Sequence, residues 1–588
     1  MEINQQAILD AISEAVGKYL IKACGDKYDS QGYLSLQGSV LNFMAAGSPI
    51  RFVLPGFPCK SPNLIDKSFG VMPDLGEAIS LKRLHSLAEE ISEIYEHGCH
   101  ISVLSDGTTF NDIVGVPDEI RVDYNRKLRK ILPSSFISWF ELRDFIKGCE
   151  TDEDIRKSLI KSANLPYRNL DDLIRSSRSD QHLRTAHDNL CSYLYNDVRL
   201  NRSPSQSEDD YLHCVSHKAY EMMLRGMALN ALIERSFPDA IRLSVHQYNN
   251  EGPKFTFAFM EGAEKVVQPW HSVPVISMSG HISLKGHAHV DKEMHALIHF
   301  NGTPWCYIEV DNPQACSLRF NLLKLPTFGL EVSGLGTLDV SAVLSPELLA
   351  HLSEQFGFLC LRDIDFKEKS QLVDFCEPFG NIYQWKFGPV HVVKPEDKPD
   401  GFVHSLEKTP VHWDLSMLPL EHEQVKKDPW FTATKFMLYC KTPPQESEGQ
   451  TTVVDGRIVL DMVGSKLAKE WESTNITYDT RMTYFGGCPR TYPLVHVHPI
   501  KGNKVFRYQE GSESELQKFT VTVDGYAQSK SDELIAWINK LIYDNRCMIA
   551  HDWKAGDLII VDNWLTLHGR LPMSENSSSR ELWRVQVF

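Results

Sequence analysis

The sequence lacks the features that mark several common classes of protein. Its 588 residues include thirteen cysteines, but these form no CxxC pair and follow no regular spacing. This argues against a zinc ribbon, a thioredoxin motif and a disulfide scaffold. No apolar run reaches the roughly 18 residues that a transmembrane helix needs, and residues 1–20 form an acidic amphipathic pattern rather than a signal peptide. We therefore expect a cytoplasmic protein with reduced thiols and no membrane partner.

The chain also lacks an excess of positive charge. It has 61 Lys and Arg residues against 77 Asp and Glu residues, a net charge of −16. This argues against nucleic acid as the main partner, but small anionic substrates stay compatible because a local cationic site can lie inside an acidic protein. The length exceeds one ordinary core, so we expect two or more domains. A homo-oligomer is left open.

Two kinds of pattern divide the sequence. Residues 1–200 are mostly helical, and strand-like runs at 100–105 and 274–284 end in polar loops, which predicts a Rossmann-like α/β domain with a largely parallel sheet. From 430 on, short apolar strands alternate with Gly, Pro and Asn turns, which predicts a double-stranded β-helix (jelly roll) with helical insertions. The segment 322–342 carries Pro and repeated Gly and is interpreted as a connector. We place the domains at 1–334 and 335–588.

One short stretch of the C-terminal domain indicates a metal site. In "VHWDLSM" (411–417), His412 and Asp414 are two residues apart, so on a strand both point to the same face. The segment 556–570 reads as a buried strand, an Asp-Asn turn and a second strand that carries His568. Two histidines and one carboxylate on a β scaffold form a facial triad with open positions, which suits non-heme Fe(II).

Fe(II) needs electrons to activate O2, and a chelating 2-oxo acid supplies them through its decarboxylation. The far carboxylate of such a co-substrate requires a planar bidentate cation, and arginine is the natural choice. The last strand offers Arg580 and Arg584, and Thr451 in "GQTTVVDG" offers a hydroxyl to the same carboxylate.

From about 335 to the end, the chain resembles the taurine dioxygenase family of Fe(II)/2-oxoglutarate oxygenases. The resemblance rests on "VHWDLS", "GQTTVVDGR", "YPLVHVHPIKGNKVFRY" and "DNWLTLHGR" followed by "RELWR". It implies Fe(II), 2-oxoglutarate and O2, and an assignment for each matching position. These are His412, Asp414 and His568 for the metal, Arg584 for 2-oxoglutarate with Arg580 as second candidate, Thr451 (beside Thr452) for the same pocket, and His496 and His498 as structural residues.

The N-terminal half carries less legible candidates. In "RFVLPGFPCKSPN" (51–63), Pro and Gly pin the backbone beside Cys59 and Lys60. A lysine held in such a loop suits phosphate binding or an imine, and the alternative is an ordinary surface lysine. Cys59 fits a small buried filler better than a nucleophile.

Two further loops gather polar side chains. "LSDGTTFND" places Asp106, Asn111 and Asp112 at a strand end, where they orient a substrate or cap the next helix. In "SGHISLKGHAHVDKE" the candidates favour a base or phosphate-binding function over a metal site, since no set at metal-ligand spacing accompanies them. They are His281, Lys285, His287, His289 and Asp291. From residue types alone, this half is an α/β domain that handles a small polar, phosphorylated molecule.

Residues of about 45–330 resemble the isonitrile (isocyanide) synthase family through "FPCKSPN", "MPDLGEAISLKRLHSLAEEI" and "ISVLSDGTTFNDIVGVPDE". The resemblance implies condensation of the amine of an amino acid, often Tyr or Trp, with ribulose 5-phosphate, whose C2 becomes the isonitrile carbon. Such chemistry needs an acid/base pair, phosphate-binding cations and a carboxylate site. The residues that fit by type are Lys60, Arg83, Asp106, Asn111, Lys285 and His287.

Together the two resemblances predict consecutive enzymes in one chain. The first would make an α-isocyano acid, and the second would remove hydrogen from its β-carbon with loss of CO2 to give a vinyl isonitrile. Desaturation with the carboxylate retained and hydroxylation are alternatives. Two other hypotheses stay open: an oxygenase whose N-terminal domain only binds or delivers an amino acid, and a sensor or scaffold with an inactive iron site. No motif names the amino acid used.

Overall fold

The computed structural model describes residues 2–22, 25–199, 202–336, 338–480 and 489–588. Packing divides the chain into two compact units. Unit 1 consists of Met1–Ile276, Ile282–Asp291 and Thr303–Tyr307, and unit 2 of Ser277–His281, Lys292–Gly302 and Ile308–Phe588. The chain thus changes unit between 276 and 308, N-terminal to the boundary expected at 334/335, which stays a prediction.

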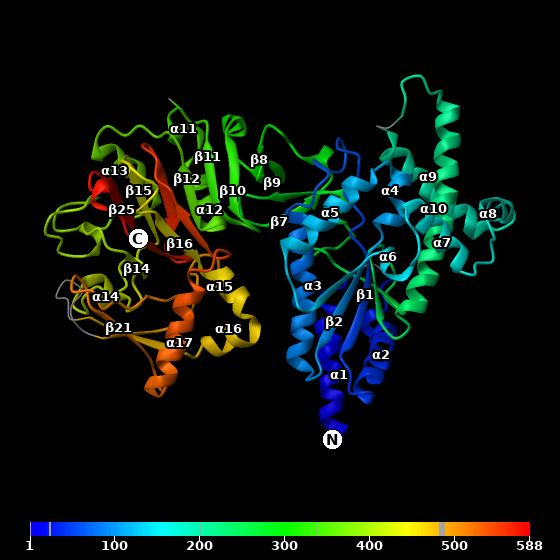
Figure 1. Ribbon diagram of the computed structural model, residues 1–588, viewed down its shortest axis with the longest axis horizontal. Coiled ribbons are helices and arrows are strands. Elements are labelled where there is room, and N and C mark those ends of the chain that lie inside the picture. The colour runs from blue at the N-terminus through cyan, green and yellow to red at the C-terminus, as the bar shows by residue number, and fades with distance from the viewer. Residues whose placement is uncertain (1, 23–24, 200–201, 337, 481–488) are drawn as a thin grey trace. The chain divides into compact units, whose positions relative to one another are not determined.

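Unit 1 is built on a parallel sheet with the strand order β3-β2-β1-β4-β5. Its strands β1 and β2 are labelled in Figure 1. The order reverses at β1, and in doubly wound α/β sheets ligands bind at the carboxyl ends of the strands next to such a point. The predicted α/β domain with a parallel sheet is confirmed. The strands are β1 (Ile50–Gly56), β2 (Cys99–Ser105), β3 (Ile137–Phe140), β4 (Ile241–Ser244) and β5 (Lys254–Thr256).

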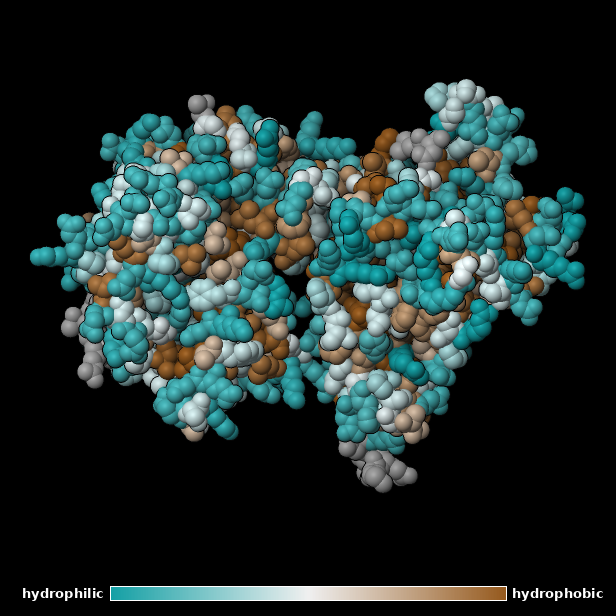
Figure 2. Space-filling view, viewed as in Figure 1, coloured by the Kyte–Doolittle hydropathy of each residue, from teal (hydrophilic) through white to brown (hydrophobic). Residues whose placement is uncertain are grey.

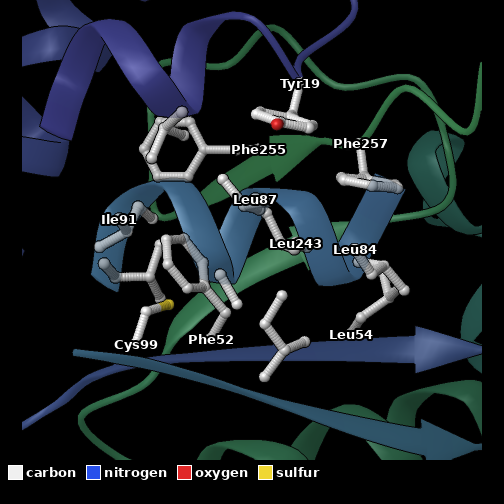
Figure 3. Packing of buried hydrophobic residues seen from close by; sticks show 14 of the residues in the cluster. Tyr19, Phe52, Leu54, Leu84, Leu87, Ile91, Cys99, Leu243, Phe255 and Phe257 are labelled. Carbon is white, nitrogen blue, oxygen red and sulfur yellow. The ribbon is translucent and has the colours of Figure 1, made fainter. Parts of the chain in front are cut away.

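Apolar side chains cover both faces of this sheet, as expected for parallel strands. Phe52 and Leu54 of β1 pack with Leu84 and Leu87 of α3 on one face (Figure 3). Val53, which alternates with them, belongs to the cluster on the other face.

The helices of unit 1 are α1 (Glu2–Gly17), α2 (Tyr33–Ala45), α3 (Leu75–Ile94), α4 (Gly107–Val114), α5 (Asp118–Ile131), α6 (Leu142–Phe145), α7 (Asp152–Ser162), α8 (Leu170–Ser177), α9 (Gln181–Asp197) and α10 (Glu208–Ser236).

The strand-like run at 274–284 does not join the parallel sheet. It forms an antiparallel hairpin of β6 (Val273–Ile276) and β7 (Ile282–Lys285), in which Ile276 lies opposite Ile282. The connection is too short for the crossover that parallel pairing requires, so only the antiparallel arrangement is accessible. Residues Thr303–Tyr307 of β9 (Thr303–Glu309) complete unit 1.

The segment 322–342 was expected as a connector, and this is wrong over much of its length. β10 (Arg319–Lys324) and β11 (Phe328–Ser333) form an antiparallel hairpin, and β11 pairs in parallel with β12 (Phe358–Leu361). Leu322 and Leu330 lie opposite each other and are buried. The alternation of buried residues between the glycines outweighs the turn signal that Gly and Pro carry.

Unit 2 contains two main sheets that enclose one apolar core. The larger is mixed, with the order β13-β25-β15-β23-β12-β11-β10-β8, and the smaller is antiparallel, with the order β14-β24-β16-β22. Phe436 of the larger sheet and Val453 of the smaller belong to the same buried cluster. The predicted C-terminal β-domain with helical insertions is confirmed, and its jelly-roll connectivity stays a prediction.

The remaining strands of unit 2 are β8 (His295–Phe300), β13 (His391–Val393), β14 (Thr409–His412), β15 (Lys435–Thr442), β16 (Thr451–Asp455), β17 (Asn475–Thr480), β18 (Arg490–Pro493), β19 (Val495–Val497), β20 (Lys504–Phe506), β21 (Phe519–Val523), β22 (Met548–His551), β23 (Leu558–Asp562), β24 (Thr566–Arg570) and β25 (Glu581–Val587). Its helices are α11 (Val340–Val343), α12 (Pro346–Phe356), α13 (Lys369–Cys376), α14 (Glu423–Lys427), α15 (Gly456–Val463), α16 (Ser465–Trp471) and α17 (Gln528–Leu541).

The surface is largely hydrophilic on the face that Figure 2 shows, with apolar patches between the hydrophilic areas. In the described part of the chain, none of the helices combines the length and the apolar character needed to cross a bilayer.

Candidate active sites

The side chains of His412, Asp414 and His568 converge in unit 2. His412 ends β14 and lies directly opposite His568 on β24, and Asp414 follows two residues later. The Nε2 atoms of His412 and His568 lie 3.7 and 3.5 Å from Asp414 Oδ1. The possible ligand atoms of the three side chains all lie within 4.8 Å of one another. We call this group the His–Asp–His cluster.

Hydrogen bonds and charge set the state of this cluster. His412 Nδ1 donates to Pro410 O at 2.8 Å, so Nε2 is the ring nitrogen that faces Asp414. Burial lowers the pKa of His568 to about 4, so the His568 ring is neutral. Burial raises the pKa of Asp414, but Arg584 and the two histidines together hold it well below its usual value. The buried Asp414 Oδ2 has no hydrogen-bond partner. Two imidazole nitrogens and a carboxylate with an unused oxygen form a donor set that fits a divalent metal ion.

Asn563 holds the backbone of Asp414 from both sides. Asn563 Oδ1 accepts from Asp414 N at 2.9 Å, and its Nδ2 donates to Asp414 O at 3.3 Å and to Ala433 O at 2.8 Å. Thr432 Oγ1 donates to the same carbonyl of Asp414. The next residue, Leu415, has a φ of 64°, which is uncommon for a side chain with a Cβ. The backbone of Asp414 is therefore held in place by Asn563, a residue that the sequence indicated only as part of a turn.

Arg584 lies beside the His–Asp–His cluster and is oriented by a chain of hydrogen bonds on its other side. Its Nη1 lies 3.6 Å from Asp414 Oδ1, and its Nη2 donates to His391 Nδ1 at 2.9 Å. His391 Nε2 then carries the proton and donates to His404 Nε2 at 3.2 Å, while His404 Nδ1 donates to Lys394 O at 3.0 Å. Burial, Arg584 and His404 lower the pKa of His391 to about 3 and keep its ring neutral. The guanidinium of Arg584 is thereby oriented beside Asp414.

Arg580 is buried, and no carboxylate of the described residues pairs with it. It is 1% exposed, and its Nε and Nη1 atoms have no hydrogen-bond partner. Burial and the neighbouring Arg570 lower the pKa of Arg580 to about 9. Thr451 lies opposite Arg570 on the neighbouring strand, and its Oγ1 accepts from Trp553 Nε1 at 3.1 Å. A buried guanidinium with unused N–H groups is suited to an anionic ligand.

A second group of possible metal ligands, Cys360, His551 and Asp557, already has its charge balanced. Asp557 Oδ2 accepts from Arg362 Nη1 at 2.6 Å and from Lys554 N at 2.7 Å, and His551 Nε2 lies 3.2 Å away. Burial raises the pKa of the Cys360 thiol. This group therefore favours a structural network over a metal site.

The other conspicuous side chains near the His–Asp–His cluster stabilise the fold. His498 accepts from the backbone N of Lys501 at 3.1 Å and donates through Nε2 to Asp562 Oδ2 at 3.1 Å. His496 packs against the ring of Trp430. Trp413 is buried in an apolar cluster with Val411 and lies under the Arg507 guanidinium at 4.7 Å.

In unit 1, Lys60 is not the surface lysine that one interpretation expected. It is 2% exposed, and its Nζ contacts Asp74 Oδ2 at 2.5 Å, Glu77 Oε2 at 2.9 Å and Pro269 O at 2.8 Å. Burial alone would lower the pKa of Lys60, but Asp74 and Glu77 raise it above its usual value. Asp74 and Glu77 also cap α3. The ammonium is charged and its donors are used, so the geometry favours a structural function over an imine or a phosphate contact.

Three more expected candidates are committed to the fold. Asn111 Nδ2 donates to Val116 O at 2.8 Å and its Oδ1 accepts from Arg156 at 3.0 Å, which holds the end of α4. Asp112 pairs with Arg225 at 2.7 Å. Arg83 donates to Ala258 O at 2.8 Å.

The "GHAH" segment contributes a structural contact. His287 is buried, with Nδ1 at 2.7 Å from Leu64 O and Nε2 at 2.9 Å from Tyr307 Oη. Lys285 ends β7 and is exposed, as are His281, His289 and Asp291. Cys59 packs in an apolar cluster, and burial raises its pKa to about 12.

Asp106, unlike Asn111 and Asp112, is not bound in a structural hydrogen bond or ion pair through its Oδ1. It follows β2, its Oδ1 is buried without a hydrogen-bond partner, and burial raises its pKa to about 7. Burial raises the pKa of Tyr193, and the carboxylates of Asp197 and, to a smaller extent, Asp106 raise it further. The Tyr193 hydroxyl lies 3.2 Å from His271 Nε2. His271 Nε2 in turn lies 4.0 Å from Asp197 Oδ2. We call these four residues the Asp106 cluster.

Two family matches cover most of the chain. The family described as "Pyoverdine/dityrosine biosynthesis protein" matches residues 40–298, and "Taurine catabolism dioxygenase TauD, TfdA family" matches residues 322–586. The isocyanide synthase xanB of Aspergillus fumigatus is 29% identical over 99% of this chain and 80% of its own length. The L-tryptophan isonitrile synthase AmbI2 of Fischerella ambigua is 30% identical over 46% of this chain and 81% of its own length.

The chain belongs to the isonitrile (isocyanide) synthase family. In this synthase an isonitrile synthase domain is fused to a TauD-family Fe(II)/2-oxoglutarate oxygenase domain, and both expected resemblances are confirmed. A third relative, the 3-((Z)-2-isocyanoethenyl)-1H-indole synthase of Fischerella ambigua, is 28% identical over 46% of this chain and 97% of its own length.

The residues that the sequence missed in this synthase share one property: their partners are distant in the chain. His271 follows an unremarkable "QPW" stretch, and Tyr193 and Asp197 lie four residues apart on α9. Their i, i+4 spacing puts them on one helix face, which was the available signal. Nothing in the sequence connects that face to Asp106.

Proposed function

We propose that this chain is a bifunctional biosynthetic enzyme. Its first domain condenses an L-amino acid with ribulose 5-phosphate to an α-isocyano acid, and its second domain oxidises that acid with loss of the carboxylate as CO2 to a vinyl isonitrile. The observation that carries the proposal is the convergence of His412, Asp414 and His568 in the same chain as an isonitrile synthase domain.

The His–Asp–His cluster would hold Fe(II) through the Nε2 atoms of the two histidines and an Asp414 oxygen. Bound Fe(II), with 2-oxoglutarate and O2, supplies the oxidising power to remove hydrogen from an unactivated C–H bond. The protein itself orients the ligands: Pro410 O holds the His412 ring, and Asn563 holds the Asp414 backbone.

For the far carboxylate of 2-oxoglutarate we propose Arg580, in preference to Arg584. Arg580 keeps two buried N–H groups unused and has no carboxylate partner among the described residues, whereas Arg584 is tied to His391 and faces Asp414. Val453 lies opposite His568, and Thr451 lies two residues further along the same strand. Two residues span about 7 Å, comparable to an extended five-carbon dicarboxylate. Thr451 would then be the hydroxyl partner beside Arg580.

Arg584 is left for a second anion, the carboxylate of the α-isocyano acid. Its place beside Asp414 would bring that carboxylate next to the metal site, with the β-carbon in reach. The names of two relatives, one for L-tryptophan and one for an isocyanoethenyl indole, support an amino acid as the first substrate and a vinyl isonitrile as the final product.

The test uses the full chain with an amino-acid mixture and ribulose 5-phosphate. Without Fe(II) and O2, an α-isocyano acid should accumulate. Adding Fe(II), 2-oxoglutarate and O2 should convert it to a product that has lost CO2 and two hydrogens in mass spectrometry. A loss of two hydrogens alone would indicate desaturation, and a gain of one oxygen would indicate hydroxylation. If no isonitrile forms without added isocyano acid, the N-terminal domain only binds or delivers an amino acid.

A further inference from the structure

The carboxyl ends of β1 and β2 collect reactive side chains from four separate segments. Asp106 follows β2, Ser61 lies in the loop after β1, Tyr193 and Asp197 lie on the last turn of α9, and His271 ends the 3-10 helix Pro269–His271. The loop after β1 joins these segments, because Ser61 Oγ donates to Asp197 Oδ2 at 3.4 Å and Ser61 N donates to Trp270 O at 2.9 Å. The segments therefore lie together beside the point where the strand order of the sheet reverses.

Asp106 is placed as an acid or base and not as a helix cap. It occupies the position before α4, but its side chain makes no capping hydrogen bond. Ser105 and Gly107 bring it against the loop after β1, since Ser105 Oγ donates to Phe57 O at 3.0 Å and a Cβ on Gly107 would lie 2.3 Å from Pro58 O. Its carboxyl is half-buried with one oxygen unused.

Tyr193 and His271 form a directed proton path. Gln268 Oε1 accepts only, so the contact of 3.3 Å means that His271 Nδ1 carries the proton. Nε2 is then the acceptor for the Tyr193 hydroxyl at 3.2 Å. Burial and Lys67 hold the pKa of His271 well below its usual value, so the ring is a neutral acceptor.

The remaining charge at the site is balanced within it. Asp197 pairs with Lys67, whose Nζ lies 4.6 Å above the Tyr193 ring, and accepts from Ser61 Oγ at 3.4 Å. Tyr193 and Lys67 are only partly buried. The site thus presents the Asp106 carboxyl, with one oxygen unused, and a hydroxyl–imidazole pair that lies beside Asp197.

We propose that Asp106 and the Tyr193–His271 pair are the acid and base of isonitrile formation, acting on the condensation of an amino-acid amine with the ketone of a ketose phosphate. This inference rests on the proposed function of the first domain. It assigns the chemistry to residues other than Lys60, Asn111, Lys285 and His287.

The condensation balances with these groups. As the C–N bond forms and the C=O π bond breaks, Asp106 gives its proton to the ketone oxygen, and the amine passes one proton to Tyr193 while Tyr193 passes its own to His271. The proton then returns from His271 through Tyr193 to the new hydroxyl, which leaves as water. Asp106 takes the second amine proton as the C=N bond forms, so both groups end as they began.

The test measures the first reaction in the full chain without Fe(II) and O2. Asp106→Asn and His271→Gln should each lower kcat for α-isocyano acid formation by about 10²–10⁴-fold, with KM values little changed. Tyr193→Phe should resemble His271→Gln, because it interrupts the same path. The matched control is Asp112→Asn, because Asp112 lies on α4, the helix that begins directly after Asp106, but outside the site. This variant should keep the wild-type rate.

A second readout separates chemistry from folding. Cyanoborohydride should trap the amino acid–ketose phosphate imine with wild-type protein and not with Asp106→Asn, while the melting temperatures of the two agree. If Asp106→Asn and His271→Gln both keep the wild-type rate, the assignment is wrong although the wild type still makes isonitrile. If the wild type makes none, the proposed function of the domain has failed instead.

Discussion

Lys60 in unit 1 and Arg580 in unit 2 are both buried cations, but their surroundings differ. Lys60 in unit 1 contacts two carboxylates and a carbonyl. Arg580 in unit 2 has no carboxylate partner among the described residues and keeps two N–H groups unused. A buried charge is costly unless it is paired, so a paired cation indicates structure and an unpaired one indicates a missing ligand. Burial alone does not distinguish a structural cation from a ligand-binding one, whereas the presence or absence of partners for its N–H groups does.

The largest effect is expected when a metal ligand is removed. His412→Ala takes one of three donors from the His–Asp–His cluster, and oxidation should be abolished because the remaining pair does not hold Fe(II) at working concentrations. The α-isocyano acid should accumulate at the wild-type rate, since the first site is separate. Mass spectrometry of the products checks both halves, and a variant that still forms the vinyl product would refute the metal assignment.

The second test removes the unpaired cation. Arg580→Leu should weaken 2-oxoglutarate binding by about 2–5 kcal/mol, the usual cost of losing one partner of a buried charge pair. Steady-state KM values for 2-oxoglutarate measure the effect. Arg584→Leu is the matched control: it should raise KM for the α-isocyano acid and leave that for 2-oxoglutarate near the wild-type value. The reverse pattern would exchange the two assignments.

The third test compares the changes in the free energy of unfolding when each cation is removed, and these changes should have opposite signs. Lys60→Met leaves Asp74 and Glu77 buried without their counter-ion, and should destabilise unit 1 by about 3–5 kcal/mol. Arg580→Leu removes a buried charge that has no partner, and should leave the protein without 2-oxoglutarate equally stable or more stable. Denaturant or thermal unfolding of the two variants measures this. Equal losses in both would contradict the distinction.

The smallest expected effect concerns the support of Asp414. Asn563→Ala removes the amide that holds the Asp414 backbone, and should lower Fe(II) affinity by about 10–100-fold, as for other residues that orient a metal ligand. Titration with Fe(II) under anaerobic conditions measures it. His498→Gln, on the neighbouring Asp562, serves as comparison and should change Fe(II) affinity less.

The sequence predicted the two families, the two kinds of domain and the members of the His–Asp–His cluster. His412 and Asp414 are two residues apart on a strand, and the strand that carries His568 is its direct neighbour. Strand periodicity and turn residues are local properties, so short motifs are enough to recognise such a site. The same reasoning found Arg580 and Arg584 but could not rank them, because the rank depends on which N–H groups the fold leaves unused.

The candidate site of unit 1 follows from tertiary packing. Lys60 is paired by residues 14 and 17 positions further along the chain, and the hydroxyl of Tyr193 on α9 reaches His271 at the end of a 3-10 helix. These segments share no periodicity and come together because the ends of parallel strands converge at one edge of the sheet. The chemical groups that the chain possesses can be read from its sequence, whereas the packing of the parallel sheet determines which of them remain unpaired at that edge.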